Sequence, residues 1–141
     1  MLGLTAKIQD PDLYSPLTLA FIGDSVYELL VRERLLSQGS RHAGELHRLA
    51  VAMVKASAQS AAYDLLEPVL EEKEAAVLKR GRNANGTHVP KNSSPADYRR
   101  ATGVEALFGW LWLRGEEARI NELFTMITEN GDRLEEDGDA R

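Results

Sequence analysis

Cysteine is absent from the 141-residue chain, and aromatic residues make up only 6% of it. The lack of thiols excludes disulfides and thiolate metal sites, and it is typical of proteins in reducing compartments. No apolar run is long enough to span a membrane, and the N-terminus is too short and too polar for a signal peptide. We therefore expect a cytoplasmic protein that does not contact membranes.

Several familiar sequence patterns are also missing. The chain has no P-loop, no dinucleotide-binding glycine motif and no Ser-His-Asp order, and its three histidines lack the spacing of metal ligands. The alternation of apolar and polar residues that marks a β-strand is absent as well. Because no segment shows strand alternation, the expected architecture is an all-α fold.

Helical periodicity runs through most of the chain. Ser15 and Ser94 are each followed by proline, a pair that predicts a helix N-cap and a first helical position. We expect helices over residues 16–38, 42–66, 71–81, 95–114 and 116–130. They would form one domain over residues 15–131, after an N-terminal segment 1–14 and before an acidic, disordered tail 132–141.

Charge is distributed unevenly along this chain, whose net charge is −5. A negative total argues against nucleic-acid binding, but six basic residues and a single acid lie between positions 79 and 100. The basic residues are Lys79, Arg80, Arg82, Lys91, Arg99 and Arg100. This segment can be an ordinary solvated loop, or its side chains can hold a phosphate backbone without reading base sequence.

Two acids interrupt apolar helical segments. Asp24 shares its expected helical face with Phe21 and Tyr27, and Glu105 shares its face with Phe108. A carboxylate on a face that leans toward the core needs a cation or a hydrogen-bond donor. Each acid can have its own local partner, or both can converge on one hard divalent cation such as Mg²⁺ or Mn²⁺. The spacing alone does not decide whether the two helices touch.

Glycines flank both acids. Gly23 precedes Asp24, and Gly103 and Gly109 lie on either side of Glu105. Glycine inside a helix costs about 1 kcal/mol relative to alanine, so it usually has a packing reason. Close contact between two helices beside a bound cation is one such reason.

Two motifs resemble those of a known family. Residues 19–26, Leu-Ala-Phe-Ile-Gly-Asp-Ser-Val, resemble the signature of the ribonuclease III catalytic domain. Residues 102–109, Thr-Gly-Val-Glu-Ala-Leu-Phe-Gly, resemble the second acidic motif of that family, and residues 78–81 resemble the segment before its variable loop. The order and the separation of these motifs agree over about residues 16–128, nearly the whole chain.

The chain departs from the general family pattern in its acids. Ala20 and Thr102 stand where Glu and Asp are typical, and the usual double-stranded-RNA-binding domain does not follow. Residues 74–84, 90–92 and 98–99 resemble Mini-ribonuclease III, a short subfamily in which a reduced set of acids is also typical. The two departures are therefore what this resemblance predicts.

The resemblance implies an all-α homodimer in which each subunit contributes one site for cutting an RNA duplex. It implies Mg²⁺ dependence, with Mn²⁺ as a possible substitute, and products with 5′-phosphate and 3′-hydroxyl ends. It further implies maturation of the 5′ and 3′ ends of the 23S ribosomal RNA precursor. A ribosomal protein is a candidate helper in recognising that precursor.

These expectations give each candidate residue a role. Asp24 and Glu105 would be catalytic residues that hold the metal ion, and Thr102 would orient a water molecule. The residues expected to contact RNA are Lys79, Arg80, Arg82, Lys91 and Arg99. Two other functions stay open, namely a dimer that binds structured RNA without cleaving it and a helical protein-interaction domain whose acids only form salt bridges.

Overall fold

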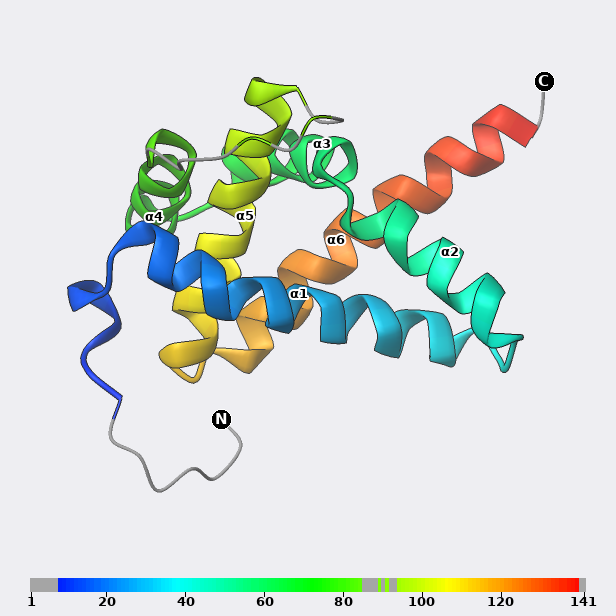
Figure 1. Ribbon diagram of the computed structural model, residues 1–141, viewed down its shortest axis with the longest axis horizontal. Coiled ribbons are helices and arrows are strands. Elements are labelled where there is room, and N and C mark those ends of the chain that lie inside the picture. The colour runs from blue at the N-terminus through cyan, green and yellow to red at the C-terminus, as the bar shows by residue number, and fades with distance from the viewer. Residues whose placement is uncertain (1–7, 85–88, 90, 92–93, 140–141) are drawn as a thin grey trace.

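Six α-helices and two short 3₁₀-helices make up the described part of the computed structural model, which comprises residues 8–84, 89, 91 and 94–139, with residues 132–139 as backbone only. The elements are η1 (Pro11–Leu13), α1 (Pro16–Ser37), α2 (Ala43–Val54), α3 (Ala56–Leu66), η2 (Glu67–Val69), α4 (Glu72–Asn83), α5 (Pro95–Leu113) and α6 (Glu117–Asp139) (Figure 1). These residues contain no strand, which confirms the all-α prediction. None of their helices is both long and apolar enough to cross a bilayer.

Local sequence signals fix where α1 and α5 begin and end. The side-chain oxygens of Ser15 and Ser94 each accept a hydrogen bond from a backbone N–H in the first turn of the helix that follows. Gly39 and Gly115 lie just beyond the two helices with φ of 113° and 74°, a backbone conformation that favours glycine. The predicted boundaries of these two helices are confirmed to within a residue.

The helix expected over residues 42–66 is wrong as a single element. Lys55 has an extended backbone, with φ −60° and ψ 154°, and separates α2 from α3. This bend lets α2 pack against α1 while α3 packs against α5. No glycine or proline lies between residues 45 and 67, so only these tertiary contacts account for the break.

The C-terminal end of the domain differs from expectation. The helix expected over residues 116–130 continues to Asp139, so residues 132–139 are helical where a disordered tail was expected. Residues 140–141 lie outside the described residues.

Near the N-terminus, the indole Nε1 of Trp110 donates a 2.8 Å hydrogen bond to the carboxylate of Asp12. That bond attaches η1 to α5.

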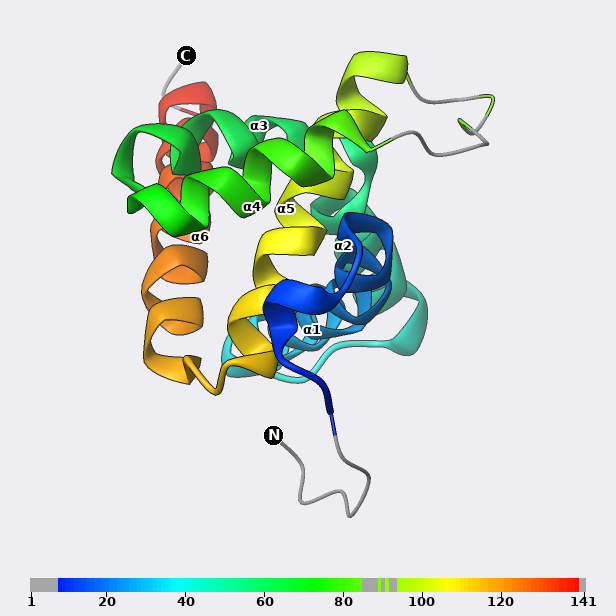
Figure 2. The ribbon, with the colours of Figure 1, turned by 90° about the vertical axis from the view of Figure 1, so that its left-hand side faces the viewer.

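Helix α5 lies at the centre of the fold. It contacts α1, α3, α4 and α6, and Figure 2 shows these helices arranged around it. Every residue from Ala101 to Leu111 is buried except Glu105, which is half-buried. A helix that is apolar on nearly all sides is what such a central position requires. Glu105 is therefore the one charged group in the middle of the core helix.

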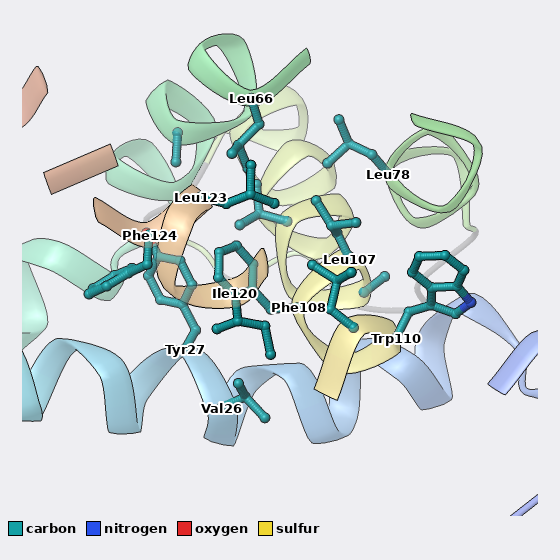
Figure 3. Packing of buried hydrophobic residues seen from close by; sticks show 14 of the residues in the cluster. Val26, Tyr27, Leu66, Leu78, Leu107, Phe108, Trp110, Ile120, Leu123 and Phe124 are labelled. Carbon is teal, nitrogen blue, oxygen red and sulfur yellow. The ribbon is translucent and has the colours of Figure 1, made fainter. Parts of the chain in front are cut away.

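The hydrophobic core fills the space between α5 and its neighbours. The ring of Tyr27 on α1 makes edge-to-face contacts with Phe108 and Phe124, with centroid separations of 5.3 Å and 5.5 Å (Figure 3). Edge-to-face aromatic pairs contribute about 0.5–1.5 kcal/mol beyond the area that they bury. The ring of Tyr27 thus links α1 to both α5 and α6.

Candidate active site

The crossing of α1 and α5 is a contact between two backbones. A methyl group added to Gly23 would overlap the carbonyl oxygen of Glu105, and one added to Gly109 would overlap the carbonyl oxygen of Leu19. Only glycine fits at these two positions, because the helices approach more closely than a Cβ atom allows. The sequence left open whether these helices touch, and the structure answers that they do.

This crossing brings the two predicted acids together. Asp24 follows Gly23 on α1, while Glu105 provides the very carbonyl against which Gly23 packs. The carboxyl groups of Asp24 and Glu105 are joined by a side-chain hydrogen bond. Two residues that are far apart in the sequence therefore form one carboxyl pair.

The two acids differ in exposure. Glu105 is half-buried, whereas Asp24 is exposed to solvent, so the expectation that Asp24 lies on a core-leaning face is wrong. Burial of Glu105, together with the hydrogen bond and the negative charge of Asp24, raises the pKa of Glu105 to about 9. Burial and the charge of Glu105 also raise the pKa of the Tyr27 hydroxyl well above its usual value. Glu105 therefore holds its proton to a higher pH than an ordinary glutamate does.

The chemistry of this pair suits a hard cation. Carboxylate oxygens are the usual ligands of Mg²⁺, which typically takes only one or two of them and completes its shell with water and phosphate oxygens. Within the described ranges, no group of three or more histidine, aspartate or glutamate side chains is placed to hold a metal. A site built from these side chains would therefore have Asp24 and Glu105 as its protein ligands.

Thr102, the predicted water-orienting residue, uses its hydroxyl within its own helix. Its Oγ1 donates a 2.9 Å hydrogen bond to the carbonyl oxygen of Tyr98, and the side chain is buried. The hydroxyl proton is thus already engaged, and only the lone pairs of the oxygen remain to accept a bond.

The predicted RNA-contacting residues lie around the end of α4 and the start of α5. Lys79 and Arg80 are exposed in the last turns of α4, and Arg99 is exposed in the first turns of α5. Between them, Lys91 is exposed, while residues 85–88, 90 and 92–93 of the same loop lie outside the described residues. Four of the five cations therefore present their charge to solvent.

Arg82, the fifth of these cations, is held in place by the fold. Its guanidinium donates a 3.1 Å hydrogen bond to the hydroxyl of Tyr63 and lies 5.8 Å from the centre of that ring. A second close crossing supports this arrangement, because a methyl on Gly103 of α5 would come within 2.7 Å of the Leu78 carbonyl oxygen of α4. The end of α4 is thus fixed against the N-terminal half of α5.

One surface feature was missed by the sequence reasoning. Apolar side chains stand exposed along α1, with Leu17 43%, Phe21 81%, Leu29 47% and Leu36 62% accessible. They recur every four, seven or eight residues, and buried residues on the core face of a helix have the same spacing. The sequence pattern therefore does not show that these residues are exposed. We call these four residues the α1 apolar stripe.

Comparison with known proteins places the chain in a family. Residues 17–116 match the Ribonuclease III domain. The Mini-ribonuclease 3 of Symbiobacterium thermophilum is 46% identical over 83% of this chain and 90% of its own length. That of Brevibacillus brevis is 45% identical over 82% of this chain and 86% of its own length.

Solved structures agree with this assignment. An X-ray structure of a protein from Fusobacterium nucleatum matches with a TM-score of 0.78 at 29% identity, covering 88% of this chain and 99% of that one. The all-α fold is therefore shared with a natural relative over nearly its whole length. The chain belongs to the ribonuclease III family, within the Mini-ribonuclease III group, and is an endoribonuclease.

Proposed function

We propose that the chain is a Mg²⁺-dependent endoribonuclease that cleaves double-stranded RNA at the Asp24–Glu105 pair. The observation that carries this proposal is the carboxyl pair itself, built at a glycine crossing on an otherwise buried helix. The ionised form of half-buried Glu105 beside Asp24 is unfavourable for the fold on its own, which is why the pKa of Glu105 is raised. A bound cation would offset that cost.

Each acid has a distinct part in this proposal. Glu105 is fixed by its place in the core helix, and Asp24 is exposed, so it would be the acid that the substrate meets from the solvent side. Both carboxylates would hold Mg²⁺, or Mn²⁺ in its place. The ion, when bound, would activate water and offset charge on the phosphodiester, leaving a 5′-phosphate and a 3′-hydroxyl. Thr102 would contribute at most its oxygen lone pairs to a bound water.

The cations near the end of α4 would hold the duplex over this pair. Lys79, Arg80, Lys91 and Arg99 are free to contact phosphates, whereas Arg82 would do so from a position set by Tyr63. A-form RNA is recognised mainly by its shape and backbone, so such contacts give weak sequence preference.

A homodimer is part of the same proposal. The α1 apolar stripe lies on the helix that carries Asp24, and Phe21 is 81% exposed one turn before it. Contiguous exposed apolar side chains usually mark a binding surface. Two copies joined along α1 would hold two carboxyl pairs close together, one for each strand.

The physiological substrate is the finer part of the proposal. Maturation of the 5′ and 3′ ends of the 23S ribosomal RNA precursor in the cytoplasm is the role that the resemblance implies, with a ribosomal protein as a helper in recognition. Cleavage of that precursor, with and without ribosomal proteins, is the assay for this role.

The decisive test compares wild type with Asp24→Asn on a long RNA duplex, in Mg²⁺ and in EDTA. We expect cleavage only by wild type in Mg²⁺, with a loss of at least about 100-fold in the variant, since even changes behind a metal ligand cost 10–100-fold. Glu33→Gln, at an exposed acid of the same helix, is the matched control and should cleave normally.

Two other results would favour the alternative functions. Duplex binding without cleavage in any divalent cation would indicate a structured-RNA-binding dimer, a possibility raised by the missing acids at Ala20 and Thr102. Failure to bind RNA at all, with no effect of Mg²⁺ on the melting temperature, would leave the acids as ordinary fold contacts.

A further inference from the structure

The lysines and arginines of the described residues fall into two groups. One group has partners within the fold, such as Arg32 with Glu28 at 2.9 Å and Arg119 with Glu74 at 2.8 Å. The members of this group are Arg32, Arg34, Arg82, Arg114 and Arg119. Each of these cations already interacts with a neighbouring group of the protein.

The second group has no ion pair or side-chain hydrogen bond with any described residue. Its members are Arg41, Arg48, Lys55, Lys73, Lys79, Arg80, Lys91, Arg99 and Arg100. Apart from Lys73, they cluster in two stretches, residues 41–55 and residues 79–100. The second stretch is the predicted RNA-contacting segment, while the first has no part in the proposed function.

The first stretch forms a line of charge along α2. Arg41, Arg48 and Lys55 are spaced seven residues apart, with Arg48 inside the helix and the others just beyond its two ends. Seven residues are about two helical turns, so Arg48 and Lys55 lie on one side of α2 about 10 Å apart. Arg41 is half-buried and precedes the N-cap His42, so it lies outside the helix. Arg48 and Lys55 are exposed, and Glu45 is the only acid in α2. We call these three cations the α2 basic strip.

The crossing of α1 and α5 separates α2 from α4, the helix that carries Lys79 and Arg80. Figure 1 shows α4 on one side of the crossing of α1 and α5, and α2 on the other. Helix α2 rises from the end of α1 toward the side of the molecule where α5 begins (Figures 1 and 2). Asp24 lies thirteen residues before the last residue of α1, a distance of about 20 Å along the helix.

We propose that the α2 basic strip is a second contact surface for the phosphate backbone of duplex RNA. It would hold the part of the duplex that extends past the cleavage point, on the side away from Lys79 and Arg80. This inference rests on the proposed function, because it takes the duplex to lie over Asp24 and Glu105.

The chemistry of the strip favours RNA over an acidic protein. Regularly spaced, solvated point charges suit the repeating phosphates of a backbone, and neutralising phosphates releases counterions. A protein partner would call for an apolar anchor among the charges. Two apolar pockets flank α2, one of about 290 Å³ lined by Leu36 and Ala50 and one of about 400 Å³ lined by Arg41 and Met53. Neither is lined by Arg48 or Lys55, so neither pocket offers an apolar anchor beside the two exposed cations of the strip.

The test measures duplex affinity as a function of salt in the Asp24→Asn background, so that the RNA stays intact in Mg²⁺. Arg48→Gln/Lys55→Gln should weaken binding roughly 10-fold at moderate salt and reduce the slope of log K against log salt by about 0.9 per lost contact. The matched control is Lys73→Gln/Arg114→Gln, which removes the same charge at exposed positions outside both stretches and should keep the parental slope.

The outcomes separate this inference from the function on which it rests. Suppose that wild type cleaves duplexes and that the Asp24→Asn protein binds them. If Arg48→Gln/Lys55→Gln and Lys73→Gln/Arg114→Gln then give the same affinity and the same salt slope in that background, the strip is not an RNA contact. If wild type neither binds nor cleaves duplexes, the proposed function fails and the strip proposal fails with it. Circular dichroism melting of both variants confirms that the comparison is between folded proteins.

Discussion

Glu105 is the single residue whose ionisation departs most clearly from that of the unfolded chain. Its pKa is raised from about 4.5 to about 9 by burial and then by the hydrogen bond and charge of Asp24. Between these two values, the folded protein holds a proton that the unfolded chain has released. The proton bound to Glu105 therefore contributes its full stabilisation below the lower pKa, and this stabilisation is lost as the pH rises through the upper pKa.

A measurable pH dependence follows for the protein without divalent cations. We expect the titration of Glu105 to lower the protein's free energy of unfolding by at most about 1.4 kcal/mol per pH unit between the two pKa values. Glu105→Gln keeps the size and a neutral hydrogen-bonding group but removes the titration, so its curve should be flatter. Urea unfolding at several pH values measures the free energy of unfolding of wild type and of Glu105→Gln. If the two curves of this free energy against pH are parallel, the pH dependence comes from another group.

Among the helices, the α1–α5 crossing gives the sharpest stability prediction. Gly23→Ala would force a methyl against the carbonyl oxygen of Glu105, and the two backbones would have to separate. Overpacking of this kind costs about 1–3 kcal/mol or more, and it would also part the two acids. Thermal and urea unfolding measure the first effect, and duplex cleavage measures the second.

Gly44→Ala is the matched control for that substitution. Gly44 is a helical glycine of α2, and an added methyl there would meet nothing within 4 Å. The same substitution should stabilise the protein by about 0.5–1 kcal/mol, since alanine is the better helix former. Equal effects at Gly23 and Gly44 would show that the backbones of α1 and α5 are not in direct contact at Gly23.

Helix α6 is joined to α4 by a shielded ion pair. Arg119 donates two 2.8 Å hydrogen bonds to the carboxylate of Glu74 and one of 3.2 Å to the carbonyl oxygen of Val69. Burial alone would raise the pKa of Glu74, but the bonds from Arg119 and the backbone N–H of Glu71 lower it overall. This contribution to stability is present above the usual pKa of a glutamate and is lost as the pH falls through the lowered value.

Removing Arg119 should leave that carboxylate without its cation. The side chain of Glu74 is only 6% exposed, so Arg119→Met should cost about 3 kcal/mol, near the lower bound for breaking a buried pair. Arg114→Gln breaks the more exposed pair with Glu116 and should cost no more than about 1 kcal/mol. Urea unfolding measures the free energy of unfolding of both variants. A small loss of this free energy in Arg119→Met would show that water reaches Glu74.

The helices differ in how far sequence could predict them. Ser15 and Ser94 gave correct starts because capping is a local interaction between neighbouring residues. The break at Lys55 was not predictable, because it depends on α2 and α3 packing against different helices. The pairing of Asp24 with Glu105 was only a possibility until the contacts of Gly23 and Gly109 showed that α1 and α5 cross there.

For the molecule as a whole, periodicity could not separate the inner face of α1 from its outer face. The run around Asp24 is apolar on both sides, and nothing in the spacing distinguishes Phe21, which is 81% exposed, from Tyr27, which is 2% exposed. The proposed dimer would cover the outer face of α1, and a face buried in a permanent dimer carries the same residue types as a core. The exposed acid between them was therefore misread as leaning inward.

The α1 apolar stripe leads to the last prediction, which concerns assembly. Phe21→Ser should convert a dimer into a monomer, because it removes the most exposed large apolar side chain of the stripe. Val69→Ser changes an exposed apolar residue in η2, away from α1, and should leave the dimer intact. Light scattering after size-exclusion chromatography measures mass, and circular dichroism checks the fold. A monomeric wild type, or a Phe21→Ser protein that stays dimeric, would remove α1 as the interface. If the monomer forms as expected, duplex cleavage should fall with it, because each duplex would then meet only one carboxyl pair.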